Sequence, residues 1–198
     1  WKVEFPDIVA VSTNKLMTQI NALMDIRRMQ RGHLQLKPAS HDPARLLEDV
    51  ETRYRMSVER AELDMLCNTS LPDKARVSVD AEVFGRMMGS MLWNAVAHAV
   101  RGSTIEVGFR SSKADGVTCY VSCAGRTIPD EEQDHLFVAF ASEASAEPPS
   151  GTISSSALGL TFCKLAMEAH GGSITLHSPR PDREDGIEVS LHFAPFGP

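Results

Sequence analysis

Four cysteines and seven histidines are the side chains with the broadest chemistry in this 198-residue sequence. The cysteines form no CxxC pair, and no cluster of cysteines and histidines has the spacing of a zinc site. Cys119 and Cys123 fall four residues apart on one face of a predicted strand, which separates them by about 13 Å, too far for a disulfide. We therefore expect reduced, buried thiols, the state typical of cytosolic proteins.

Hydroxyl groups and a glycine define a second chemical feature. Ser154 to Ser156 stand close to Gly159, at the start of a helix predicted over Leu158–His170. Hydroxyls and the free backbone N–H groups of a helix N-terminus both donate hydrogen bonds to phosphates. The same serines also suit a plain mobile loop, because 141–156 is rich in Ala, Ser, Pro and Glu. The serine run by itself leaves both interpretations open.

Composition and charge narrow the classes of function. Hydrophobic residues make up 42% and charged residues 23%, as in an ordinary globular protein. The net charge of -6 repels phosphate and argues against a nucleic-acid partner. No apolar run approaches the roughly 20 residues that cross a bilayer, and the first residues lack the layout of a signal peptide. The sequence does not begin with Met, so we expect a piece of a longer chain.

The N-terminal part predicts a long helix over Asp7–Arg31, because apolar residues recur at three- and four-residue steps. A single helix has nothing of its own against which to bury such a stripe, so it needs a partner helix in this chain or another. Gly32 ends the helix, and the alternation in His33–Lys37 predicts a short strand. The stripe consists of Val9, Leu16, Met17, Ile20, Leu23, Met24 and Ile26.

Strands and helices alternate in the rest of the sequence. Pro38–Asp42 is predicted to be a linker, and Asp42 followed by Pro43 is a good helix start, since a capping side chain precedes a residue with φ already set. This order predicts an α+β fold, a two-layer sandwich in which helices cover one face of a mixed sheet. The predicted elements are a helix from 42, strands 63–67 and 76–79, a helix over 80–100, strands 104–110 and 117–123, a short acidic helical turn from 130, a helix over 158–170, and strands 173–177 and 186–193.

Five segments resemble, in order and spacing, the motifs of the cytoplasmic half of sensor histidine kinases with a GHKL-type ATP-binding domain. Leu23–Leu36 is similar to the second helix of that family's dimerisation hairpin and its exit. The resemblance covers nearly the whole chain and implies the family's sandwich fold. The other motifs are similar to the N box, the first glycine box, the F box and the second glycine box: Ser90–Ala99, Val121–Pro129, Leu136–Phe140, and Leu158–Leu160 followed by Glu168–Gly172.

The resemblance implies a site for ATP and Mg²⁺. Asn94, in the N box, would hold Mg²⁺ at the phosphates, because a hard cation prefers oxygen ligands such as a carboxamide. His98 also suits an ordinary hydrogen-bonded histidine, and Lys164 also suits a surface lysine. The nucleotide-binding residues that the resemblance implies are Asn94, His98, Cys123, Gly125, Thr127, Phe137, Ser155, Leu158, Gly159 and Lys164.

Several of these positions depart from the family pattern. Cys123 stands where the family has an Asp that binds the adenine amino group. A thiol is a poor acceptor, and losing such a charge-assisted hydrogen bond costs about 1.5–3 kcal/mol. Thr127, Ser155 and Ala157 replace glycines that let the backbone approach the ligand, and Ala97 replaces a basic residue of the N box. These departures lower the expected affinity for ATP.

The family's phosphoacceptor is a His followed by an acidic residue and a Pro-containing turn, on the first hairpin helix. All seven histidines of this sequence lack that context, so the first hairpin helix, with the catalytic His, is not in this sequence. Either it lies outside the sequence or the protein never had it, and the unpaired stripe on 9–26 favours the first alternative. The predicted organisation is a partial dimerisation helix in 1–34, a linker and the start of the catalytic domain in 35–50, and a histidine-kinase-like ATP-binding domain in 51–198.

Two functions follow from the resemblance. One is an active protein-histidine kinase region that transfers the γ-phosphoryl group of ATP to a His on the absent helix. The other, which the departures favour, is a degenerate module with weak or no ATP binding that acts as a scaffold for a response regulator or a partner kinase. A pocket adapted to another ligand is a third, minor possibility. In each case the resemblance implies a cytoplasmic location, a response regulator receiver domain as partner, and a homodimer through helix 7–31 and the missing helix.

Overall fold

The computed structural model describes residues 17, 20–29, 31, 35–72, 74–111, 116–137 and 155–194. Residues 20–29 are helical and form the end of the predicted N-terminal helix, whose residues 7–16 lie outside the described ranges. The elements that follow are β1 (Ala39–His41), α2 (Pro43–Arg60), β2 (Asp64–Ser70), β3 (Val77–Val79), α3 (Ala81–His98), β4 (Thr104–Ser111), β5 (Val117–Cys123), α4 (Asp130–Gln133), the 3-10 helix η1 (Asp134–Phe137), α5 (Ser155–Ala169), β6 (Ser173–His177) and β7 (Ile187–Phe193).

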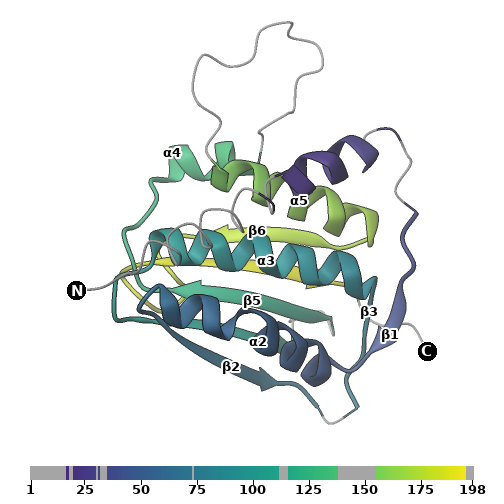
Figure 1. Cartoon of the computed structure of the whole chain (residues 1–198), viewed down its shortest axis with the longest axis horizontal. Helices are drawn as coiled ribbons and strands as arrows, with labels where there is room; N and C mark the ends of the chain where they lie inside the picture. Colours follow the sequence, from purple (N-terminus) through teal and green to yellow (C-terminus); the bar gives the residue numbers. More distant parts are fainter. Residues whose placement is uncertain are drawn as a thin grey trace, which may run out of the picture.

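Five strands form one mixed sheet in the order β2-β4-β5-β7-β6. β2 and β4 run parallel, with α3 in the connection between them, whereas every other pair in this sheet is antiparallel. The helices α2, α3 and α5 lie over one face of the sheet, with α3 in the middle (Figure 1). The prediction of an α+β two-layer sandwich is confirmed.

The main core lies between α3 and the sheet. The ring of Phe84 stacks on that of Phe109 in β4, with ring centroids 6.0 Å apart, and lies 6.4 Å from the ring of Phe193 in β7. One turn further along α3, the Met88 sulfur contacts the Cys119 thiol of β5 at 3.6 Å. This interface fixes the orientation of α3 on the sheet. It therefore also determines which side chains of α3 point away from the sheet.

Aspartate side chains cap the starts of α2 and α3, where the sequence predicts that these helices begin. The carboxylate of Asp42 accepts a hydrogen bond from the backbone N–H of Ala44 at 3.0 Å, and Pro43 occupies the first turn of α2. At the start of α3, the carboxylate of Asp80 accepts from the backbone N–H of Val83 at 3.1 Å. Each cap satisfies a donor that the helix itself leaves free, which is why both helices begin where the sequence predicts.

The predicted linker 38–42 is wrong in part. Residues 39–41 form β1, which pairs antiparallel with β3, Ala39 opposite Val79. The strand predicted at 76–79 therefore belongs to this small two-stranded sheet and not to the main one. Three residues with a distant pairing partner carry no local strand pattern, which explains the difference.

Two other boundaries differ from the sequence prediction. Residues 35–37 are outside any strand, although 33–37 was predicted to be one, and 33 and 34 fall outside the described ranges. The helix predicted from Leu158 begins at Ser155, because serine is well tolerated at a helix start. The other strand and helix boundaries agree with the prediction to within a few residues.

The cysteines behave as the sequence predicts. All four lie in the described ranges and are free, with Cys119, Cys123 and Cys163 buried and Cys67 half-buried. In the part of the chain that the structure describes, no helix has both the length and the apolarity to cross a membrane.

Candidate nucleotide-binding site

The seam between α3 and α5 brings two of the predicted site residues together. Asn94 is half-buried on α3, and Ser90, one turn earlier, is buried. A side-chain Cβ on Gly159 of α5 would lie 3.2 Å from the Cβ of Ser90 and 3.9 Å from Nδ2 of Asn94. The two helices therefore approach closely at Gly159, and the start of α5 lies beside the Asn94 carboxamide.

The backbone that follows β5 is bound to the end of α3. The N–H of Val100 donates to the carbonyl of Ala124 at 2.9 Å, and Ala99 and Gly125 form an isolated antiparallel bridge. A Cβ on Gly125 would lie 2.3 Å from the carbonyl oxygen of His98, closer than any side chain tolerates. Gly125 is thus required by the packing of the loop on α3, independently of any ligand.

The Cys123 thiol ends β5 on the face covered by the helices. It is 2% exposed, and burial raises its pKa to about 11, against an opposing effect of Arg180. The group is therefore a neutral thiol at physiological pH. A neutral thiol lacks the charge and the acceptor strength of a carboxylate, so this side chain does not fit the role of binding an adenine amino group.

A hydrogen-bonded network that the sequence analysis missed holds the loop after Gly125. The Ser178 hydroxyl accepts from the N–H of Ile128 at 2.8 Å and donates to the carbonyl of Gly186 at 2.9 Å. The Gln133 amide donates to the carbonyls of Ile128 and Ser178, each at 2.9 Å. This network ties α4 and the β6–β7 connection to the loop. It joins residues 128–133 to residues 178–186, and this long-range pairing forms no motif, so no local signal reveals it.

The remaining predicted site residues occupy different environments. His98 and Thr127 are exposed, and Phe137, Leu158 and Lys164 are half-buried. The 3-10 helix that ends in Phe137 packs against α5, so the F box and the second glycine box are neighbours. Ser155 begins α5, but its side chain is outside what the structure describes. Most of the mobile loop predicted over 141–156 falls within residues 138–154, outside the described ranges, and its last two residues belong to α5 instead.

The glycines of the two motifs divide into two groups. Gly125 and Gly159 remain, and in both cases a Cβ would press on neighbouring protein atoms. Thr127, Ser155 and Ala157 hold side chains where the family has glycine, and Thr127 is exposed. Of the two glycines that remain, Gly125 is required by the protein's own packing, and Gly159 lies at a tight contact with Ser90.

Asn94 is the residue best suited to Mg²⁺. This ion commonly takes one or two protein oxygens and completes its octahedron with phosphates and water, so a carboxamide beside a phosphate fits. Among the described residues, no group of three or more His, Cys, Asp or Glu is placed to hold a metal ion. The residues present fit the metal end of a nucleotide better than they fit its base.

Comparison with known sequences gives a family match. The family described as "Histidine kinase-, DNA gyrase B-, and HSP90-like ATPase" matches residues 79–195. The alginate biosynthesis sensor protein KinB of Pseudomonas aeruginosa is 29% identical over 167 residues, which cover 83% of this chain and 26% of KinB. The sensor-like histidine kinase SenX3 of Mycobacterium tuberculosis is 24% identical over 174 residues, which cover 88% of this chain and 41% of SenX3. The chain thus spans less than half the length of these relatives.

Solved structures share the fold. The catalytic domain of histidine kinase ThkA superposes with a TM-score of 0.63 at 19% identity, covering 79% of this chain and 95% of that one. Full-length ShkA in complex with AMPPNP has a TM-score of 0.70 at 17% identity and covers 92% of this chain and 36% of that one. ThkA in complex with the response regulator protein TrrA has a TM-score of 0.65 at 17% identity, with 98% and 52% covered.

Proposed function

This chain belongs to the histidine kinase-, DNA gyrase B- and HSP90-like ATPases, and on that premise we propose that it is the degenerate catalytic domain of a two-component sensor kinase. In this proposal it binds ATP weakly or not at all, and it serves as a scaffold for a response regulator or a partner kinase. The histidine-kinase relatives and the shared fold support the signalling context.

The buried, neutral thiol of Cys123 is the observation that carries the proposal. The family's pocket needs an acceptor at this position, and a charge-assisted hydrogen bond there is worth about 1.5–3 kcal/mol. The distribution of glycines supports the same conclusion. Gly125 is required by packing and Gly159 lies at a tight contact between helices, so neither glycine by itself argues that a nucleotide binds.

An active kinase domain is the second candidate, and the proximity of Asn94 to Gly159 favours it. In that case Asn94 would hold Mg²⁺, which supplies charge neutralisation at the transferring phosphoryl group. The start of α5 would present backbone N–H groups to the phosphates. The acceptor His would come from a helix outside this sequence.

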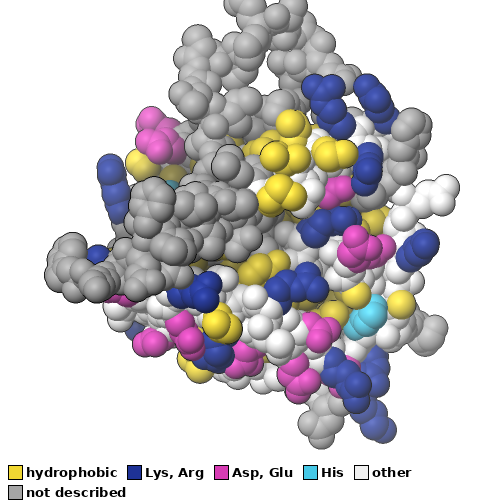
Figure 2. Space-filling model, in the orientation of Figure 1, with side chains coloured by type: hydrophobic (Ala, Val, Ile, Leu, Met, Phe, Trp, Pro, Cys, Tyr) yellow, Lys and Arg dark blue, Asp and Glu magenta, His cyan; other side chains and the backbone are white. Residues whose placement is uncertain are grey.

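The exposed face of the helical segment 20–29 supports a homodimer. Met17, Ile20 and Met24 are each more than half exposed, and Leu23 is 37% exposed. Hydrophobic side chains gather over this segment (Figure 2). Ile26, which the sequence places on the same stripe, packs instead on the core of the sandwich and is 1% exposed. We infer that the exposed part of the stripe packs against the first helix of a dimerisation hairpin, with residues 1–34 as the dimerisation unit. We further infer that the assembled module binds a response regulator receiver domain, as ThkA binds TrrA. A cytoplasmic location follows from this role.

Calorimetric titration with ATP and Mg²⁺ tests the proposal. The degenerate form predicts no saturable heat at submillimolar ATP for the natural sequence. Cys123→Asp should then raise the affinity by about tenfold to a hundredfold, because it restores the charged acceptor. Cys123→Asn is the matched variant, since it offers a carbonyl acceptor without adding a buried charge, and it should gain less.

Tight binding to the natural sequence that disappears in Asn94→Ala would overturn the degenerate form and establish the active one. Absence of binding in every variant would place the defect at the other altered positions. Circular dichroism of each variant establishes that the sandwich is folded before the titrations are compared.

A further inference from the structure

The helical segment 20–29 packs one of its faces on the catalytic sandwich. Ala22 and Ile26 are 4% and 1% exposed and join the main hydrophobic core. Asp25 lies between them on the same face and is 3% exposed. A carboxylate therefore stands in the middle of an otherwise apolar contact, where a leucine of similar size would bury more apolar surface.

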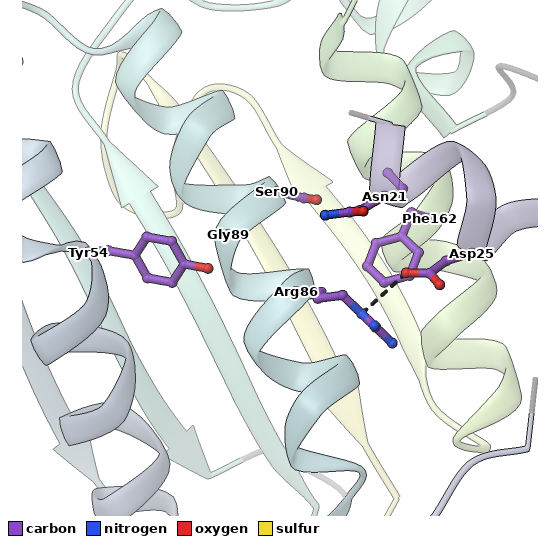
Figure 3. A pocket seen from close by; sticks show the side chains of 8 residues that line it. Asn21, Asp25, Tyr54, Arg86, Gly89, Ser90 and Phe162 are labelled. Carbon is purple, nitrogen blue, oxygen red and sulfur yellow. Dashed lines mark ion pairs between the residues drawn. The ribbon is translucent and has the colours of Figure 1, made fainter. Parts of the chain in front are cut away.

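Asp25 faces Arg86 of α3 across this contact (Figure 3). Oδ2 of Asp25 and Nε of Arg86 are 3.2 Å apart, and both atoms are buried. Their alignment does not make a hydrogen bond, so neither atom has a hydrogen-bond partner among the described residues. The pair has the attraction of opposite charges without the directional bond that makes buried ion pairs strong.

The arginines around Asp25 do not fully compensate for the burial of its carboxylate. Burial raises the pKa of Asp25, although Arg86 and Arg28 both act to lower it. Burying the carboxylate therefore costs more than the two arginines offset. A buried pair of this kind contributes little to the stability of the contact, and apolar replacement of both partners is commonly neutral or stabilising.

Each partner of the pair also has a second partner on its own helix. Asp25 lies 3.8 Å from Arg28, whose side chain is 57% exposed. Arg86 lies 3.1 Å from Glu82, whose side chain is 83% exposed. If the segment separated from α3, both charges would keep an ion pair and regain water. Release therefore leaves no unpaired charge behind.

The packing beside the pair is loose. A cavity of about 150 Å³ lies between the segment, α2, α3 and α5, beside the two charged side chains. Side chains that border a cavity lack packing partners on that side, so the contact between the segment and the sandwich gains less from packing than a close-packed contact would. The residues that line the cavity are Asn21, Ala22, Asp25, Tyr54, Arg86, Gly89, Ser90 and Phe162.

We propose that segment 20–29 docks reversibly on α3 and α5, and that the Asp25–Arg86 pair keeps this docking reversible instead of holding it in place. Asn21 of the docked segment and Ser90 of α3 line the same cavity, and Ser90 also lies against Gly159 at the α3–α5 seam. In this proposal, Ser90 is the residue through which docking reaches the seam. The inference concerns the movement of the segment and holds whether or not the seam binds ATP.

Amide hydrogen exchange at residues 22–29, measured relative to the amides of β5 in the same chain, tests the proposal. Arg86→Met strands the buried carboxylate, so the segment should exchange at least about tenfold faster. The double variant Asp25→Leu/Arg86→Met should exchange more slowly than the natural sequence, because it replaces a poorly compensated pair by apolar contact. The ratio to β5 removes any general loosening of the sandwich.

Glu82→Gln is the matched control, since it removes an exposed partner of Arg86 and should change the ratio little. A double variant that exchanges as fast as Arg86→Met would overturn the proposal, because the pair would then be a net attraction. Unchanged exchange in Arg86→Met would overturn it as well, because the pair would then have no part in docking.

Discussion

The two faces of α3 differ in the polarity of their side chains and in the elements that they contact. The face toward the sheet carries Phe84 and Met88, which are 2% and 0% exposed and pack on apolar groups of β4 and β5. The opposite face carries Arg86, Ser90 and Asn94 at steps of four residues and meets a docked helix, a polar cavity and the start of α5. The face toward the sheet stabilises the fold. The opposite face holds the contacts on which the proposed docking of segment 20–29 and the candidate nucleotide site depend.

The largest loss of stability should come from disrupting the face of α3 that packs on the sheet. Phe84→Ala removes a ring packed between Phe109 and Phe193, and the cavity left behind adds to the lost burial. We expect the free energy of unfolding to fall by about 3–5 kcal/mol. Denaturant unfolding followed by circular dichroism measures this loss. Met56→Ala, at a site 64% exposed on α2, is the control and should stay within about 0.5 kcal/mol. Equal losses in the two variants would contradict the division between the faces.

A smaller effect should come from the end of α3, where the loop after β5 packs. Gly125→Ala places a methyl group 2.3 Å from the carbonyl oxygen of His98, so the backbone must shift. We expect a loss of about 1–3 kcal/mol in the free energy of unfolding, even with no nucleotide present. Thr127→Gly, two residues on and exposed, should change the same quantity by less than about 1 kcal/mol. If Gly125→Ala leaves stability unchanged, Gly125 is not required by packing, and its presence becomes an argument for a ligand.

Most of the fold was predictable because its signals are local. The aspartate caps of α2 and α3, the apolar stripe of α3 and the alternation in β4 and β5 each lie within one stretch of sequence. The pairing of β1 with β3 was missed because it depends on residues far along the chain. The N–H of Asp80 donates to the His170 ring at 3.0 Å, across 90 residues, and such contacts leave no local pattern either.

The sequence predicted where the candidate site lies, but not how well its residues suit a nucleotide. Motif spacing placed Asn94 and Gly159 in one neighbourhood, and the structure brings them together. Two features of the site depend on tertiary packing and have no signal in the sequence. The Cys123 thiol is buried and neutral, and Gly125 is required because a Cβ there would clash with a carbonyl of α3. Asp25 was missed because a single carboxylate on a helix predicted to pair elsewhere looks like an exposed residue. Its burial depends on which face of the helix meets the sandwich.

The smallest expected effect is a pH dependence of docking on the polar face. Burial raises the pKa of Asp25 above its usual value of 3.8, so the docked segment binds the proton more strongly than the released one. This contribution to docking is fully present below the usual carboxyl pKa and is lost as the pH rises through the raised pKa of Asp25. The charged groups that act on Asp25 are Arg86 and Glu82 of α3 and Arg28 of its own helix.

Exchange at residues 22–29 relative to β5, corrected for the intrinsic effect of pH, should therefore be slower at mildly acidic than at neutral pH. Asp25→Asn removes the titrating group and should flatten the profile, whereas Glu82→Gln should leave its direction unchanged. A profile that runs in the opposite direction would mean that the two arginines outweigh burial, and the Asp25–Arg86 pair would then be an attraction that holds the segment in place.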